Sequence, residues 1–189
     1  MARRYGITAN TYKKFIVDSG AVYVNYGEAG QAKLGATRGG STFTIETEYR
    51  DMPVDGAKGA VKGGRRITSV NATLTVNFVE LSASIMSRAL PGSSIADFPA
   101  TVGKTQDEIT RTLQIALTDY ATNIALLGEV TGNATTPAVF IVKNALADGN
   151  FEIALTDAEE PVLSITFKAH FDPSTMDAEP WAVRYPTIA

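Results

Sequence analysis

Two segments of the chain alternate between apolar and polar residues, the pattern of β-strands that have one packed face and one wet face. They span residues 42–50 and 69–77. The apolar positions, which we expect to pack into a core, are Phe43, Ile45, Tyr49, Val70, Ala72, Leu74 and Val76. The polar positions are Thr42, Thr44, Glu46, Glu48, Ser69, Asn71, Thr73, Thr75 and Asn77. This wet face is nearly free of positive charge, which suits a surface that lines a space better than one that grips a ligand.

The two segments are separated by a long glycine-rich stretch at residues 51–64, which contains four glycines, one proline and few large apolar residues. This composition predicts a loop. Loops of this length are uncommon in compact domains and are usually functional. The strand that follows is expected to span residues 65–79, with a β-bulge between Ile67 and Val70, where the alternation changes phase.

One helix is expected, directly after this strand. Leu81, Ile85 and Ala89 recur at helical spacing, Ser82 can cap the helix, and Pro91 with Gly92 ends it. Upstream, the β-prone segments 15–18 and 21–26 flank the turn signal Asp18-Ser19-Gly20 and predict a hairpin.

The rest of the chain reads as short strands, loops and two terminal arms. Residues 27–40, with five glycines, and residues 91–107 predict loops. Further strands are expected at 109–116, 124–130, 138–143, 151–155 and 162–171. The arms span residues 1–11 and 172–189, the second anchored by Trp181 and Tyr185. We therefore expect one domain over residues 1–189, an all-β sandwich or barrel with one flanking helix.

The composition excludes several classes of function. A formal net charge of -3 argues against a protein that binds nucleic acid by neutralising phosphates. The absence of cysteine excludes disulfide frameworks, thiolate zinc sites and cysteine nucleophiles. No stretch approaches the roughly 18 apolar residues of a membrane helix, so we expect no membrane partner.

Catalytic groups are sparse. The only histidine, His170, alternates onto a polar face beside Lys168 and Thr166, where we expect a solvated strand position. The Gly-x-Ser-x-Gly elbow of serine hydrolases is absent. The glycine-rich stretch 27–40 lacks the nucleotide-binding patterns and precedes a strand instead of a helix. We therefore expect no catalytic residue, no metal, no cofactor and no enzymatic activity.

The chain has one local basic cluster, formed by Lys58, Lys62, Arg65 and Arg66. It could be a phosphate or nucleic-acid patch, or an interface cluster balanced by nearby aspartates. No aromatic stacking platform is interleaved with it, which favours the interface. The polar strand faces also lack the lysines that usually protect exposed sheet edges, apart from Lys168. Edges that pair with a neighbouring subunit can omit this protection.

Five segments follow one another in a characteristic order and spacing: Gly20–Glu28, Leu34–Glu46, Val54–Arg66, the strand Asn71–Leu81 and the helix that ends in Leu90-Pro91-Gly92. In this order and spacing they resemble the major tail tube proteins of long-tailed (siphovirus-type) bacteriophages. The match is densest over residues 15–92. Through residues 110–171 only the strand pattern and Phe167–Asp172 contribute.

The resemblance implies a structural subunit. Six copies would form a ring around a continuous inner β-barrel, and stacked rings would form a conduit through which DNA enters the host. Loop 51–64 would be an inter-ring stacking element, and both arms would touch neighbours. The implied partners are other copies of the chain, a tape measure protein, a tail terminator and distal tail components, with transient passage of double-stranded DNA. The implied location is the virion tail, after synthesis in the host bacterial cytoplasm.

These expectations assign residues to two surfaces. The residues expected to line the channel are Thr44, Glu46, Glu48, Asn71, Thr73 and Thr75. The residues expected at the inter-ring contact are Asp55, Lys58, Lys62, Arg65 and Arg66. A tube component of a contractile or secretion machine is an alternative with the same architecture. A small-ligand-binding β-barrel or a β-fold hydrolase is an alternative of another class.

Overall fold

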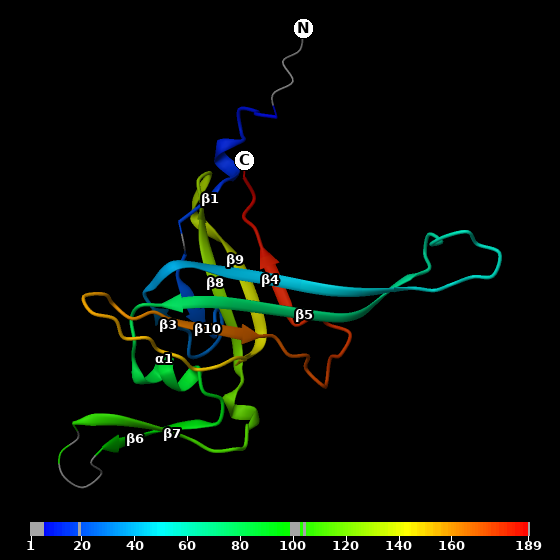
Figure 1. Cartoon of the computed structure of the whole chain (residues 1–189). Coiled ribbons are helices and arrows are strands. Elements are labelled where there is room, and N and C mark those ends of the chain that lie inside the picture. Colours follow the sequence, from blue (N-terminus) through cyan, green and yellow to red (C-terminus); the bar gives the residue numbers. More distant parts are fainter. Residues whose placement is uncertain (1–5, 19, 99–102, 104, 189) are drawn as a thin grey trace.

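Two β-sheets cross each other and enclose the main hydrophobic core (Figure 1). The computed structural model describes residues 6–18, 20–98, 103 and 105–188. One sheet, here the polar sheet, contains β4, β5 and β10, and the other is built on β8 and β9. The strands are β1 (Ile16–Val17), β2 (Val22–Val24), β3 (Ala32–Gly35), β4 (Thr37–Asp51), β5 (Arg65–Phe78), β6 (Ser93–Phe98), β7 (Gln106–Arg111), β8 (Ala121–Val130), β9 (Asn133–Ala147), β10 (Leu163–Lys168) and β11 (Trp181–Arg184). The described residues contain a single α-helix, α1 (Ala83–Arg88). They also contain two short 3-10 helices, at Tyr12–Lys14 and Leu117–Asp119.

Nine of the strands follow the path β3-β2-β8-β9-β10-β5-β4, with β1 on β8 and β11 on β9, while β6 and β7 pair antiparallel in a separate two-stranded hairpin. Strand β9 belongs to both sheets, because it pairs with β8 along most of its length and with β10 at Ala147 and Leu146. The predicted all-β fold class with a flanking helix is therefore confirmed.

The core fills the space between the crossed sheets. Its largest fully buried side chains include Phe78, Phe167, Leu74, Ile124 and Val142. The apolar positions predicted on the two long strands supply one wall: Ala72, Leu74 and Val76 are buried, and Phe43 and Ile45 pack against them. Tyr49 is 54% exposed, because β4 and β5 extend past the core at that end (Figure 1).

Two local features of the sequence appear as predicted. Glu48 pairs with Ser69 and Tyr49 pairs with Ile67, so Thr68 is an extra residue in β5, and the bulge lies between Ile67 and Val70. The Ser82 hydroxyl accepts a hydrogen bond from the Ile85 N–H at 3.3 Å and caps α1.

The predicted hairpin near the N-terminus is wrong. Strands β1 and β2 both pair antiparallel with β8, so they follow one another along the same neighbour and do not fold back on each other. Pairing of both segments with β8 outweighs the local turn signal. Asp18, with a φ of 68°, lies at the break between β1 and β2.

Several predicted boundaries also need correction. Residues 27–40 are only partly a loop, because they contain β3 and the start of β4. Strand β6 lies within residues 91–107, which were predicted to be a loop. Strand β7 spans Gln106–Arg111 and is therefore shifted toward the N-terminus relative to the predicted strand 109–116. Residues 151–155 are β-prone but form no strand, because no neighbouring strand pairs with them in the described part of the chain.

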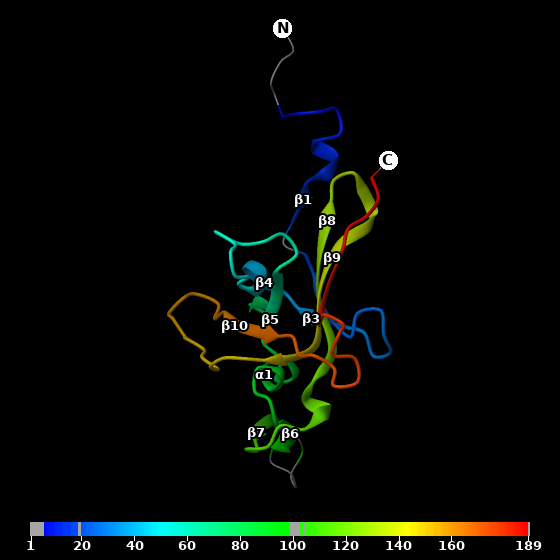
Figure 2. The ribbon, with the colours of Figure 1, turned by 90° about the vertical axis from the view of Figure 1, so that its right-hand side faces the viewer.

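The two terminal segments lie side by side at one end of the molecule (Figures 1 and 2). The Tyr185 hydroxyl donates a hydrogen bond to the Lys14 carbonyl at 2.9 Å. Trp181 packs against the main core and pairs with Val142 on β9. Both predicted anchors thus hold the C-terminal segment, although β11 makes part of that segment a strand. Residues 1–5 of the N-terminal arm lie outside the described residues.

Gly20 gives a first testable prediction. A Cβ atom at this position would lie 0.9 Å from the Leu127 carbonyl oxygen, so the backbone must shift to accommodate any side chain. We expect Gly20→Ala to lower the free energy of unfolding by about 1–3 kcal/mol, the usual cost of overpacking. Gly59→Ala is the matched control, because a Cβ there meets nothing within 4 Å. Equal denaturant midpoints for the two variants would contradict the close contact between the Gly20 backbone and the Leu127 carbonyl.

Candidate functional site: a polar sheet face and a projecting loop

The six residues predicted to line a channel share one face of the polar sheet. Strand register places Thr44 opposite Thr73 and Glu46 opposite Asn71, while Thr42 faces Thr75. Residues directly opposite one another in a β-ladder point to the same side. The residues of β10 that pair with β5 extend the same face, which comprises Thr42, Thr44, Glu46, Glu48, Ser69, Asn71, Thr73, Thr75, Asn77, Ser164, Thr166 and Lys168.

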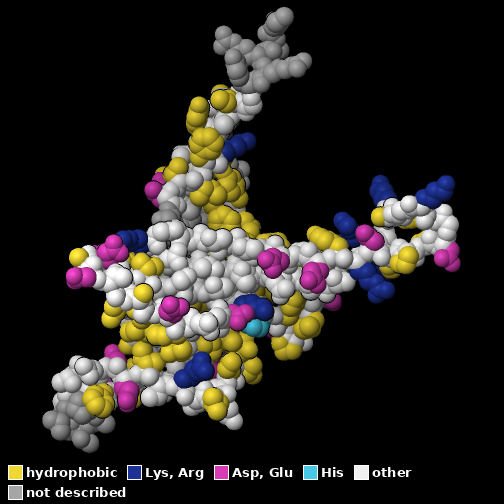
Figure 3. All heavy atoms as spheres, viewed as in Figure 1, with side chains coloured by type: hydrophobic (Ala, Val, Ile, Leu, Met, Phe, Trp, Pro, Cys, Tyr) yellow, Lys and Arg dark blue, Asp and Glu magenta, His cyan; other side chains and the backbone are white. Residues whose placement is uncertain are grey.

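Side chains on this face bond to one another across the strands. The hydroxyls of Thr75 and Thr166 lie 2.9 Å apart, and Ser69 donates a hydrogen bond to Glu48 Oε2 at 2.9 Å. The one lysine of the rows, Lys168, lies 3.6 Å from Asp148, which offsets its charge. Figure 3 shows the area over β4 and β5 as mostly white and magenta. The face is therefore hydroxyl-rich and neutral to acidic.

The polar sheet has open edges on both sides. Strand β4 ends the path and pairs only with β5 among the described residues. On the other side, β10 pairs with β9 through Phe167 and Lys168 only, so Leu163–Ile165 has no strand beside it there. An open edge presents unpaired backbone N–H and C=O groups. The shortage of lysine on the polar strand faces predicts such edges, but it does not indicate which strands carry them.

Strands β4 and β5 form a long hairpin that projects away from the core and carries the loop 52–64 at its tip (Figure 1). The loop was predicted over residues 51–64 and starts one residue later, because Asp51 still pairs with Arg65 in the ladder. Two hydrogen bonds order its base: the Met52 N–H donates to the Gly64 carbonyl at 2.8 Å, and the Gly64 N–H donates to the Val61 carbonyl at 2.9 Å.

The five residues predicted at an inter-ring contact lie at or beside this tip, and all are exposed. The Arg65 guanidinium bonds to Asp51 at 2.9 Å and lies 5.0 Å from the centre of the Tyr49 ring. The hydrogen bond and the charge of Asp51 raise the pKa of Arg65. Arg65 therefore stabilises the base of the loop, while the exposed Asp55, Lys58, Lys62 and Arg66 leave their charges open to solvent.

The position predicted for His170 is wrong. It lies two residues beyond the end of β10, half-buried, with its ring edge-on to Tyr120 at 5.1 Å. His170 Nδ1 lies 3.1 Å from the Asn144 carbonyl, and the Asn144 side-chain amide donates to the His170 carbonyl at 3.1 Å. Strand β10 ends at Lys168, and although burial still alternates through Ala169 and His170, the histidine lies outside the strand and is only partly exposed.

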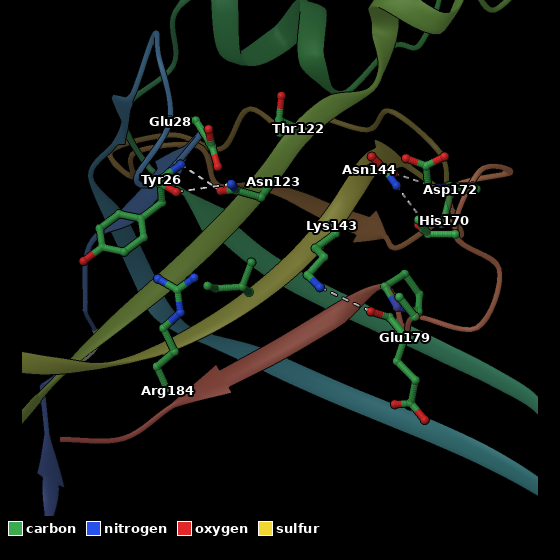
Figure 4. Close-up of a pocket in the computed structure, with 14 residues that line it drawn as sticks. Tyr26, Glu28, Thr122, Asn123, Lys143, Asn144, His170, Asp172, Glu179 and Arg184 are labelled. Carbon is green, nitrogen blue, oxygen red and sulfur yellow. Dashed lines mark hydrogen bonds between the residues drawn. The ribbon is translucent and has the colours of Figure 1, made fainter. Parts of the chain in front are cut away.

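A cavity of about 250 Å³ opens beside His170 (Figure 4). Its polar groups hold loops together. Asn123 accepts from the Tyr26 N–H at 2.7 Å, and Lys143 donates to the Glu179 carbonyl at 3.4 Å. Hydrogen bonds from Ser174 lower the pKa of Asp172, which keeps that carboxylate ionised and bound. No nucleophile–base pair is assembled among these described residues.

The described part of the chain contains no group of three or more His, Cys, Asp or Glu side chains placed to hold a metal ion. None of its helices is long and apolar enough to cross a membrane.

Comparisons with known proteins give distant structural matches only. No family model matches the chain, and no curated protein matches it. One solved structure, the tail of an empty gene transfer agent particle with C6 symmetry, matches at 9% identity and a TM-score of 0.46, over 89% of this chain and 96% of that chain. A second, the virion of a native gene transfer agent particle, matches at 8% identity and a TM-score of 0.45, over 88% and 96%. Identities and scores this low leave function to be judged from the chain's own residues.

Proposed function

We propose that this chain is a structural subunit of a phage-type tail tube, in which hexameric rings stack into a hollow conduit for DNA. The observation that carries the proposal is the neutral-to-acidic face of the polar sheet, bounded on both sides by open strand edges. The resemblance of residues 15–92 to tail tube proteins points to the same assembly.

Ring closure satisfies the open edges. The two edges differ, since one belongs to β4 and the other to β10, so copies can join head to tail around a closed ring. A closed barrel has no unpaired edge, which removes the aggregation risk of an exposed one. The polar face would then line the bore, with Thr44, Glu46, Glu48, Asn71, Thr73 and Thr75 toward the DNA.

A neutral-to-acidic bore suits transport. Phosphates bind proteins chiefly through lysine and arginine, and this binding releases counterions from the DNA. The polar face contains one lysine, Lys168, which lies 3.6 Å from Asp148. The proposed bore therefore offers the phosphates no free cation on this face. Double-stranded DNA could therefore slide through without being retained.

The projecting hairpin also supports an assembly. Beyond the core, Tyr49 and Ile67 pair with each other and remain 54% and 55% exposed on the core-facing side of the hairpin. Large apolar side chains exposed together are typical of a contact surface. In the proposed tube, neighbouring subunits cover this part of the hairpin and the loop 52–64.

This role is non-enzymatic and places the protein in the virion tail. Its partners would be other copies of the chain, a tape measure protein, a tail terminator and distal tail components. A tube of a contractile or secretion machine would share the ring geometry and differ in needing a sheath or tip to grow. The ligand-binding and hydrolase alternatives are less well supported, because His170 and Asn144, which line the cavity, are hydrogen-bonded to each other.

Negative-stain electron microscopy of the purified protein tests the proposal. We expect hollow rods or stacked rings with six-fold symmetry, formed without any other protein. Size-exclusion chromatography provides the control, since assembly must depend on protein concentration. A chain that remains monomeric at all concentrations and salt conditions, and forms neither rings nor rods, would overturn the proposed function.

A further inference from the structure

Charge is divided between the two ends of the polar sheet. The basic tip, defined here as residues 50–66, carries five cations and two carboxylates. The acidic segment, defined as residues 148–162, carries five carboxylates and no cation. The cations are Arg50, Lys58, Lys62, Arg65 and Arg66, and the carboxylates of the acidic segment are Asp148, Glu152, Asp157, Glu159 and Glu160.

Strand register places these segments far apart in one molecule. The acidic segment leads directly into Leu163, which pairs with Phe78 at the end of β5. Arg65, at the basic tip, is the other end of the same strand. A strand of 14 residues is roughly 45 Å long. Figure 1 shows the acidic segment and the tip on opposite sides of the molecule, so one copy cannot bring them together.

Each segment keeps unpaired charge. In the acidic segment, Glu160 bonds to Arg38 at 2.8 Å and Asp148 lies near Lys168. Its remaining carboxylates have no ion pair within the described chain; they are Glu152, Asp157 and Glu159. At the tip, Arg65 is bound to Asp51. The tip cations without an ion pair in those same residues are Arg50, Lys58, Lys62 and Arg66.

The two segments also have complementary apolar features. The loop 52–64 curls around an open hollow of about 320 Å³, lined mainly by Met52, Pro53, Val54, Ala57 and Ala60. Leu155, in the acidic segment, is 81% exposed. An exposed leucine flanked by carboxylates matches an apolar hollow flanked by lysines.

We propose that the acidic segment of one copy receives the basic tip of another copy, with Leu155 seated in the hollow of the loop 52–64. The occupant is a second copy of this chain, because the charges and apolar groups that match the acidic segment lie on the chain itself. The inference rests on the proposed tube and names the partner of its stacking loop. Opposite ends of the sheet then meet between successive rings, which gives the stack a direction.

Charge reversal tests the pairing. One variant, the all-basic variant, carries Glu152→Lys, Asp157→Lys and Glu159→Lys, so its acidic segment and tip are both basic. The all-acidic variant carries Lys58→Glu, Lys62→Glu and Arg66→Glu, so both surfaces are acidic. We expect each variant alone to form rings but no rods, and an equal mixture to form rods of alternating rings. Rods from either variant alone, or rings without rods in the mixture, would overturn the pairing.

Salt provides a second readout of the same contact. The Debye length falls from about 10 Å at 0.1 M to about 3 Å at 1 M salt. At the higher salt concentration the repulsion between like-charged segments is screened. We therefore expect high salt to restore part of the rod growth of the all-basic and of the all-acidic variant, each assembled alone. Failure of high salt to restore any growth would count against an electrostatic contact.

Cysteine crosslinking locates the contact without changing any charge. The natural chain has no cysteine, so only the introduced cysteines can form disulfides. Rods of the Ala57→Cys, Leu155→Cys variant are expected to give a ladder of disulfide-linked copies on a non-reducing gel. The control variant pairs Ala57→Cys with Ala29→Cys, an exposed position outside the acidic segment, and should give no ladder. If the wild-type chain and the Ala57→Cys, Leu155→Cys variant both form rods but the variant gives no ladder, this inference is overturned and the proposed tube is left intact. A wild-type chain that forms no rings or rods would overturn both.

Discussion

Rods of the Glu46→Lys, Glu48→Lys variant are expected to retain double-stranded DNA that wild-type rods release. Both glutamates lie on the polar face, opposite Asn71 and Ser69, so the change turns an acidic stretch of the proposed bore basic. A six-fold ring repeats the change six times. A protein that neutralises about 6–10 phosphates loses roughly 10³–10⁵ in DNA affinity between 50 and 200 mM salt. Retention should therefore be strong at low salt and lost at high salt.

The measurement is co-sedimentation of a short labelled duplex with rods assembled in its presence, across a salt series. The control variant, Glu28→Lys with Glu129→Lys, makes the same change in net charge at exposed positions outside the polar sheet. If the two variants retain DNA equally, the glutamates of β4 do not face the bore.

Phe167→Ala is expected to lower the free energy of unfolding by about 3–5 kcal/mol, the usual cost of truncating a buried phenylalanine. Phe167 is 2% exposed and pairs with Leu74 on β5 and with Ala147 on β9. Its ring therefore fills the core where the two sheets join. Against a typical stability of about 5–15 kcal/mol, this loss is large enough to unfold part of the population.

Denaturant unfolding of the unassembled protein measures this effect. Phe98→Ala is the matched control, because Phe98 is 49% exposed on the separate β6–β7 hairpin. We expect the control to change stability by less than about 1 kcal/mol, since surface substitutions usually have small effects. A similar loss in both variants would mean that Phe167 does not hold the sheets together.

The alternation of residues 42–50 and 69–77 was sufficient to predict the polar face, because a period of two fixes which side chains share a side. The change of phase near Thr68 likewise predicted the bulge. The glycine-rich start of β4 was not predicted, since Gly39 and Gly40, both at φ 84°, resemble loop residues. Thr37 and Ser41, on either side of these glycines, pair with Phe78 and Val76 on β5 across a register shift, so long-range pairing and not local propensity keeps the segment in the strand.

The positions of the open edges and the separation of the two charged segments could not be predicted from the sequence alone. The carboxylates of residues 148–162 are visible in the sequence, but only the pairing of Leu163 with Phe78 places them opposite the basic tip. The hairpin expected near Asp18 failed for the same reason. Both of its arms prefer a distant strand, β8, which no local signal identifies.

Strand β9 contributes hydrogen bonds to both layers of the molecule. In the proposed tube, a load applied along the inner layer would therefore pass into the outer layer through continuous covalent backbone, in addition to side-chain contacts. Such a connection would resist shear between the two layers while a stiff polymer is driven through the proposed bore.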